Sequence, residues 1–230
     1  MISEMIGIIF AVIISVGIPL IVLLYAIYKK YYIPFILGVL AFVVSQMLLR
    51  IPLMEYIAQH SAFYSMFSVT RPVLFAIAIG LSAGVFEEIA RFVAMCFFMK
   101  QRDWRAGFLF GAGHGGIEAV LFVGISAITL LFSPVISSSS LYMIGGVERF
   151  FAIVLHIGLS IIVLQAVVRR RIIYLILAIL LHGLIDALVG ILPVYLSRDY
   201  ALMTIEVALA ITAIAVFGYS LWIKRKGVLP

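Results

Sequence analysis

The chain has 230 residues, of which 66% are hydrophobic and only 11% are charged, and its formal net charge is +6. A soluble domain carries roughly 25% charged residues, so this composition excludes an ordinary soluble protein and indicates an integral membrane protein. Nucleic-acid binding is also excluded as the reason for the positive charge. The lysines and arginines stand in short clusters between apolar runs, where membrane topology places them.

Seven apolar runs follow one another along the chain. A transmembrane helix needs about 20 mostly apolar residues. The sequence predicts such helices at residues 5–28, 33–54, 72–99, 106–132, 147–168, 172–192 and 201–223. The first run lacks the basic segment of a signal peptide and is too long for one, so we expect it to be retained. The predicted fold class is an all-α, polytopic membrane helix bundle, with residues 1–230 forming a single integral membrane domain.

Basic residues occupy every second connection between these helices. They are Lys29 and Lys30, then Lys100, Arg102 and Arg105, then Arg169, Arg170 and Arg171, and finally Lys224, Arg225 and Lys226. The alternate connections carry few. By the positive-inside rule, the N-terminus is predicted to lie outside and the C-terminus in the cytoplasm. The expected localisation is the cell membrane, as a multi-pass protein.

Ionisable residues interrupt four of the predicted helices, where their burial is costly and indicates function. They are Glu87, Glu88 and Arg91, then His114 and Glu118, then His156, and lastly His182 and Asp186. Counted from the cytoplasmic helix ends at about 1.5 Å per residue, all lie roughly 12–22 Å from the inner membrane boundary. One site at mid-membrane depth is therefore predicted, within a motif-bearing core at about 72–192.

The spacing of these residues is also helical. Residues three or four apart share a helix face, which pairs Glu87 and Glu88 with Arg91, His114 with Glu118, and His182 with Asp186. Arg91 can neutralise one glutamate and leave the other for chemistry. Glu118 and Asp186 are expected to orient the histidines of their own helices.

Two further features of the sequence concern the packing and the ends of these helices. Glycines at four-residue spacing, Gly107, Gly111 and Gly115 in one row and Gly80 and Gly84 in another, predict close approach of helix backbones. Glu148 and Arg149 fall near the outer end of the fifth predicted helix, where a cap or an interface anchor is expected.

A carboxylate beside neutral imidazoles suits the activation of water. Zinc is one option, with His114, His156 and His182 as candidate ligands and an open position for water. The HExxH motif of soluble zinc proteases is absent, and 114–118 reads HGGIE. A metal-free route, with a glutamate as general base and a histidine stabilising the oxyanion, therefore remains open.

Three segments resemble known motifs. FEEIAR at 86–91, FLFGAGH at 108–114 and HGLID at 182–186 look like the motifs of the CAAX-protease and bacteriocin-processing family and of the related PrsW proteases. The wider pattern of EEIAR, GHGGIEA and ERFFAIVLHIGLS most resembles the YhfC family of intramembrane metalloproteases. Arg91 follows Glu88 by three residues, one fewer than in the CAAX-protease motif, which fits the PrsW-like branch better and argues against assigning a prenylated substrate.

The resemblance implies hydrolysis of peptide bonds of membrane-associated substrates. It makes Glu87 the base that activates water and Glu88 its support, paired with Arg91. His114 becomes a ligand of metal or water, and His182 with Asp186 completes the site and stabilises the oxyanion. His156 is additional to the three motifs and is a candidate third imidazole of a metal site.

Two other functions remain open. Intramembrane Glu, Asp and His residues also form the proton relays of proton- or cation-coupled transporters. Against a transporter, the sequence shows no internal repeat. The other alternative is a non-catalytic scaffold that binds membrane helices. The expected partner is a membrane protein or peptide substrate, and the sequence leaves the oligomeric state open.

Overall fold

The computed structural model describes residues 2–132 and 139–229. The first two spans are helices with a π-helical segment in the middle. The first is α1 (Ile2–Val12), η1 (Ile13–Gly17) and α2 (Ile18–Tyr28), and the second is α3 (Tyr32–Phe42), η2 (Val43–Arg50) and α4 (Ile51–His60). The remaining elements are α5 (Ala62–Thr70), α6 (Pro72–Phe97), α7 (Trp104–Ala119), η3 (Val120–Gly124), α8 (Ile125–Leu131), α9 (Ser139–Arg169), α10 (Ile173–Tyr195) and α11 (Arg198–Arg225).

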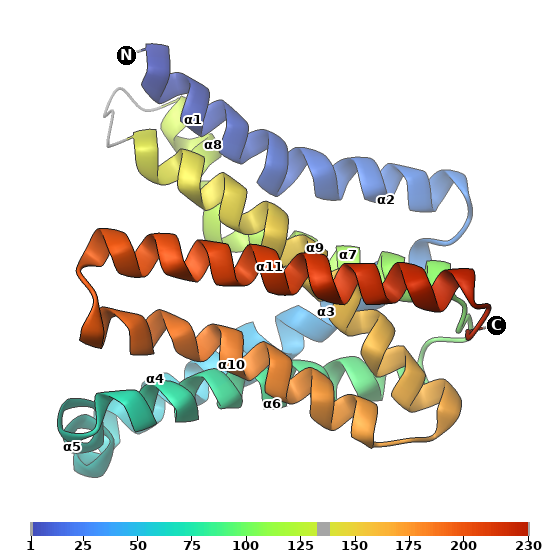
Figure 1. The fold of residues 1–230 in the computed structure, drawn as a ribbon. Helices are drawn as coiled ribbons and strands as arrows, with labels where there is room; N and C mark the ends of the chain where they lie inside the picture. The colour runs from blue at the N-terminus through green and yellow to red at the C-terminus, as the bar shows by residue number, and fades with distance from the viewer. Residues whose placement is uncertain (1, 133–138, 230) are drawn as a thin grey trace.

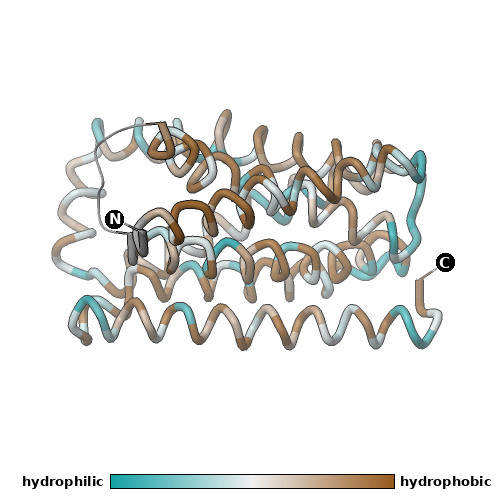
Figure 2. The backbone as a smooth tube through the Cα atoms, turned by 90° about the horizontal axis from the view of Figure 1, so that it is seen from above, coloured by the Kyte–Doolittle hydropathy of each residue, from teal (hydrophilic) through white to brown (hydrophobic). Residues whose placement is uncertain are grey.

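The predicted all-α bundle is confirmed. Among the described residues, seven helices are long and apolar enough to cross a membrane, and no strand is present. Figure 2 shows hydrophobic residues along most of the long helices, with hydrophilic residues mainly near the two ends of the bundle. The largest differences from the predicted spans are in the second, which ends at His60 instead of residue 54, and in the fifth, which begins at Leu141 instead of residue 147.

Helix α9 is the central helix of the bundle. In its most apolar stretch 83% of the residues are buried, whereas the corresponding fraction in the other six spans is between 22% and 39%. Its sides pack against α1, α7, α10 and α11 (Figure 1). A polar side chain on α9 therefore points at other helices and needs a partner on one of them.

The two ends of the bundle differ in charge. The α2–α3, α6–α7 and α9–α10 connections and the C-terminus lie at one end, on the right in Figure 1, and carry the four basic clusters. We call this the basic end. The α4–α5 segment and the α10–α11 connection lie at the opposite end. If the positive-inside rule holds here, the basic end faces the cytoplasm.

Both predicted glycine rows lie at close helix contacts. An ideal Cβ on Gly111 would lie 2.4 Å from Ile157 Cα, and one on Gly80 would lie 2.4 Å from the Gly183 carbonyl oxygen. The row on α7 thus faces α9, and the row on α6 faces α10. Only glycine allows backbones this close, which is how the helices that carry the polar residues converge.

We expect Gly111→Ala to destabilise the fold. The added methyl group would sit 2.6 Å from the His156 carbonyl oxygen, so α9 must move away, and overpacking of this kind costs about 1–3 kcal/mol. Thermal unfolding of the protein in detergent measures the effect. Gly218→Ala on α11 is the matched control, because its Cβ meets nothing within 4 Å. Equal unfolding temperatures for the two variants would contradict the packing argument.

Candidate functional site

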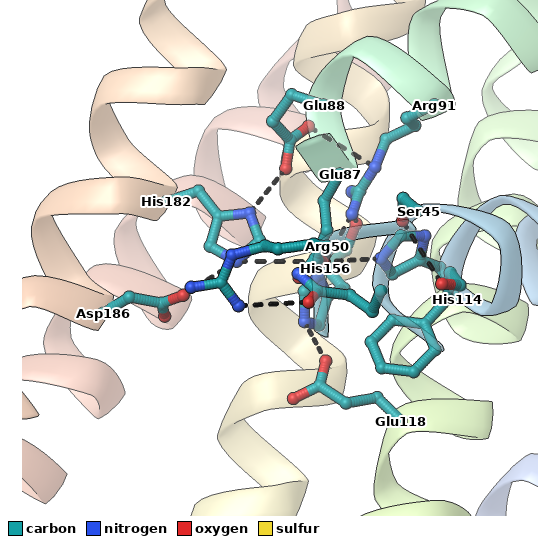
Figure 3. Close-up of polar contacts among 12 residues, drawn as sticks. Ser45, Arg50, Glu87, Glu88, Arg91, His114, Glu118, His156, His182 and Asp186 are labelled. Carbon is teal, nitrogen blue, oxygen red and sulfur yellow. Dashed lines mark hydrogen bonds and ion pairs between the residues drawn. The ribbon is translucent and has the colours of Figure 1, made fainter. Parts of the chain in front are cut away.

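The eight ionisable residues predicted from the sequence form one network of contacts in the middle of the bundle (Figure 3). They come from α6, α7, α9 and α10. Glu87, Glu88, Arg91, and the histidines at 114, 156 and 182 are all buried. Helices that are distant in sequence therefore meet at one level, as the depth count predicts.

Glu87 contacts two of the three histidines. Its Oε2 lies 2.8 Å from His114 Nε2 and 3.8 Å from His182 Nε2. Its Oε1 accepts a hydrogen bond from the side-chain amide of Gln46 on η2. No guanidinium group among the described residues pairs with this carboxylate. Its negative charge is therefore held by imidazole and amide groups only.

Glu88 has the opposite surroundings. Its Oε2 lies 3.4 Å from Arg91 Nε, and its Oε1 accepts a hydrogen bond from His182 Nδ1 at 2.8 Å. Arg91 is completely buried and also donates to Ser160 Oγ and to the His156 carbonyl oxygen. Arg91 therefore neutralises Glu88. Because Glu88 holds Nδ1–H of His182, this imidazole presents Nε2 to its other neighbours.

His156 is held on both sides. Arg91 Nη2 lies 3.1 Å from Nδ1, and Glu118 Oε2 lies 2.5 Å from Nε2. A guanidinium group can only donate, so Nδ1 accepts and the proton resides on Nε2. The structure differs here from the expected pairing of Glu118 with His114, because Gly115 lets the His156 ring approach α7 closely.

Arg149 is a second buried guanidinium in this network, not a cap or an interface anchor as expected. It is 9% exposed and donates to Glu118 Oε1 at 2.7 Å and to the carboxylate of Glu148. The reason is the position of the helix start. Since the fifth span begins at Leu141, Arg149 lies about two turns inside it.

A cavity of about 180 Å³ adjoins the network. Its walls include Gln46, Arg50, Glu87, Glu118, His182 and Asp186. A space of this size holds several water molecules, and the polar side chains among its walls provide their hydrogen-bond partners. Glu88 and Arg91 do not border it. Of the two adjacent glutamates, Glu87 alone faces this space.

Three side chains offer ligand atoms that lie close enough together to share one metal ion. One atom each from Glu87, His114 and His156 lies within 4.8 Å of the other two, the one such group in the described residues. His182 is not part of this group, although it borders the cavity together with Glu87 and His156. Two imidazoles and one carboxylate form a donor set that suits zinc.

Comparison with known proteins identifies the family. The family described as YhfC intramembrane metalloprotease matches residues 12–141 and 131–211. The chain is also 34% identical to the uncharacterized membrane protein YhfC of Bacillus subtilis (strain 168), over 83% of each chain. The chain belongs to the YhfC family. No solved structure matches it.

The metal implied by the YhfC family description fits the charges of the site. Five carboxylates and three guanidinium groups belong to the network or border the cavity, and with neutral histidines their formal charge is −2. They are Glu87, Glu88, Glu118, Glu148 and Asp186, with Arg50, Arg91 and Arg149. A divalent cation brings this sum to zero, which lowers the cost of burying the carboxylates together.

Gln46 and Arg50 of this YhfC-family chain are site residues that the sequence analysis did not single out. Gln46 is 4% exposed, and Arg50 Nη1 donates to its Oε1 at 3.1 Å. A signal for them was available, because they are two polar residues four apart in an apolar helix. They lie in the π-helical segment η2, and such segments often occur at functional sites.

Proposed function

We propose that this chain is a metal-dependent peptidase that hydrolyses peptide bonds of membrane-associated substrates. One observation carries the proposal: two imidazoles and a carboxylate converge within 4.8 Å, beside a cavity with several charged side chains in its walls, inside a bundle of membrane helices. The YhfC family description supports the same activity. The bacterial relative and the basic clusters support a multi-pass location in the cell membrane.

In this proposal Glu87, His114 and His156 hold the metal, and zinc is the ion that their donor atoms suit best. When bound, zinc lowers the pKa of a coordinated water and polarises the carbonyl group to be attacked. In the structure, the Nε2 atom of each imidazole contacts a carboxylate oxygen, that of Glu87 for His114 and that of Glu118 for His156. Coordination through these nitrogens requires their protons to move, so metal binding is expected to weaken as the pH falls.

His182 supplies the proton transfer. Glu88 accepts its Nδ1–H and fixes the ring, so Nε2 is the nitrogen that takes a proton from water and returns it to the leaving amine. Asp186 Oδ2 lies 3.6 Å from the same nitrogen, and its side chain is 40% exposed. It can therefore exchange protons between His182 and the water of the cavity.

The test is cleavage of a membrane-spanning peptide by purified protein in proteoliposomes, followed by mass spectrometry. Wild type loaded with zinc is expected to cleave, and both a chelator and His114→Ala are expected to stop cleavage. His60→Ala is the matched control, because His60 is exposed on α4, where its ring stacks on Tyr56 outside the network. An intact substrate in every sample would overturn the proposal, and solute flux in the same vesicles would favour a transporter.

A further inference from the structure

Arg50 is a cation in the wall of the site cavity with no carboxylate partner. Its Nε donates to Ser82 Oγ at 3.0 Å, its Nη1 to Gln46 Oε1 at 3.1 Å and its Nη2 to the Ile79 carbonyl oxygen at 2.9 Å. All three acceptors are neutral. Throughout the part of the chain that the structure describes, no Asp or Glu oxygen lies within 4.0 Å of it.

Arg50 differs in this respect from the two other guanidinium groups of the site. Arg91 and Arg149 each face at least one carboxylate at salt-bridge distance. A guanidinium has five N–H groups, and the three contacts of Arg50 leave one N–H on each terminal nitrogen. Two such N–H groups in a plane match the two oxygens of a carboxylate. The three neutral contacts hold the side chain in place without cancelling its charge.

Gln46 connects Arg50 to Glu87. The Gln46 side-chain oxygen accepts from Arg50, and its nitrogen donates to Glu87. Both Arg50 and Glu87 border the same cavity. A carboxylate bound to Arg50 would therefore stand in a fixed position relative to Glu87, with the Gln46 amide bridging Arg50 and Glu87.

The position of Arg50 also defines a direction. Its partners Ile79 and Ser82 precede Glu87 on α6, and α6 runs from the opposite end toward the basic end. Arg50 thus lies between Glu87 and the opposite end. Asp186, which borders the same cavity, likewise follows His182 toward that end on α10. A substrate carboxylate on Arg50 would sit on the side away from the basic clusters.

We propose that Arg50 binds a carboxylate of the peptide substrate and so selects peptides that carry a negative charge close to the cleaved bond. The inference rests on the proposed function. The carboxylate is either the C-terminal one of the peptide or that of an acidic side chain, because the fork of Arg50 fits both. With a divalent cation bound, the formal charge of the site is zero, so a substrate carboxylate is not opposed by a net negative site.

The experiment measures binding and cleavage of matched probes. A dansylated, uncharged peptide of leucine and alanine is prepared with a free C-terminal carboxylate and as its amide. A second amidated pair carries glutamate or glutamine inside the peptide. Fluorescence polarisation with zinc-loaded protein, read at once after mixing, measures binding, and mass spectrometry of the same samples over time measures cleavage.

Wild type is expected to prefer the carboxylate member of one pair by about 10- to 100-fold, the effect of a hydrogen bond to a charged group. The pair that shows the preference identifies the source of the carboxylate. Arg50→Gln is expected to bring the ratio near unity, whereas Arg50→Lys keeps part of it because it retains the charge without the fork. Arg198→Gln, which removes an exposed charge at the same end of the bundle, is expected to keep the ratio unchanged.

Equal affinities of wild type for both members of both pairs would overturn the role of Arg50, and so would a preference that survives in Arg50→Gln. If Arg50→Gln does not fold, Arg50→Lys and the wild-type ratios decide. The two proposals fail differently. Cleavage of all probes without preference leaves the peptidase and removes the carboxylate site. A binding preference without any cleavage leaves the carboxylate site and removes the peptidase.

Discussion

Glu87→Gln is expected to reduce peptide hydrolysis by about 10²–10⁴-fold, the range of a lost acid–base or ligand group at the reacting centre. Glu87 is the glutamate that faces both His114 and the cavity, and Arg91 does not neutralise it. Glutamine keeps the size of the side chain and can still accept from Gln46. The loss is therefore chemical rather than structural.

Metal content decides between two roles for this carboxylate. The resemblance to known motifs makes Glu87 the base, whereas the geometry favours a metal ligand. As a ligand, Glu87→Gln loses zinc together with activity, as measured by elemental analysis of the purified variant. Full zinc occupancy with lost activity would instead identify Glu87 as the base. Wild-type cleavage rates would contradict both roles.

Glu88→Gln is the matched comparison for stability, because it makes the same change one residue away and its amide oxygen can still accept Nδ1–H of His182. Its expected effect is on stability, since Arg91 then faces no carboxylate, and breaking a buried ion pair costs about 3–5 kcal/mol. Glu87→Gln removes one of five carboxylates from a site of formal charge −2, so its unfolding temperature should not fall. Thermal unfolding in detergent separates the two variants.

The spans and the level of the site follow from the sequence because each depends on one helix at a time. Apolar length sets a span, and the rise per residue sets the depth of Glu87, His114 or His182 within it. The pairing of Glu88 with Arg91 is equally local, three residues apart on one helix, and the structure contains it. Local geometry was sufficient for these predictions.

The pairing of Glu118 depended on a neighbouring helix. The four-residue rule places Glu118 beside His114 on an isolated helix. In the bundle, the glycines of α7 bring α9 so close that Glu118 meets His156, and His114 reaches across to Glu87 on α6. Which helix lies against which face is a property of the packed bundle, and a single helix pattern does not contain it.

Arg149 and Arg50 show a related limit. Both lie toward the opposite end of their spans, where a charged side chain can reach the interface. Arg149 does not reach it, because α9 extends further than predicted and is enclosed by other helices. Arg50 turns inward because Gln46, Ser82 and the Ile79 carbonyl oxygen provide acceptors there. Two of these three acceptors, Ser82 and Ile79, belong to a different helix, α6, which the pattern of one span does not contain.

His182→Ala is expected to lower the rate of hydrolysis by about 10²–10⁴-fold while leaving the zinc content unchanged. Its Nδ1 is held by Glu88, and its Nε2 lies 3.8 Å from Glu87 and 3.6 Å from Asp186, outside the group that offers metal ligands. This separates proton transfer from metal binding. Turnover at saturating substrate and elemental analysis of one preparation measure both quantities.

His114→Ala is the variant to compare with His182→Ala, because the loss of a metal ligand is expected to remove zinc and activity together. If His182→Ala also loses zinc, His182 is a third imidazole ligand, as the sequence alone suggested, and Glu88 orients a ligand instead of a base. If His182→Ala keeps both zinc and turnover, the proton passes through another group. Asp186, which borders the same cavity, is then the residue to replace, because its carboxylate is the partly exposed group nearest to His182 Nε2.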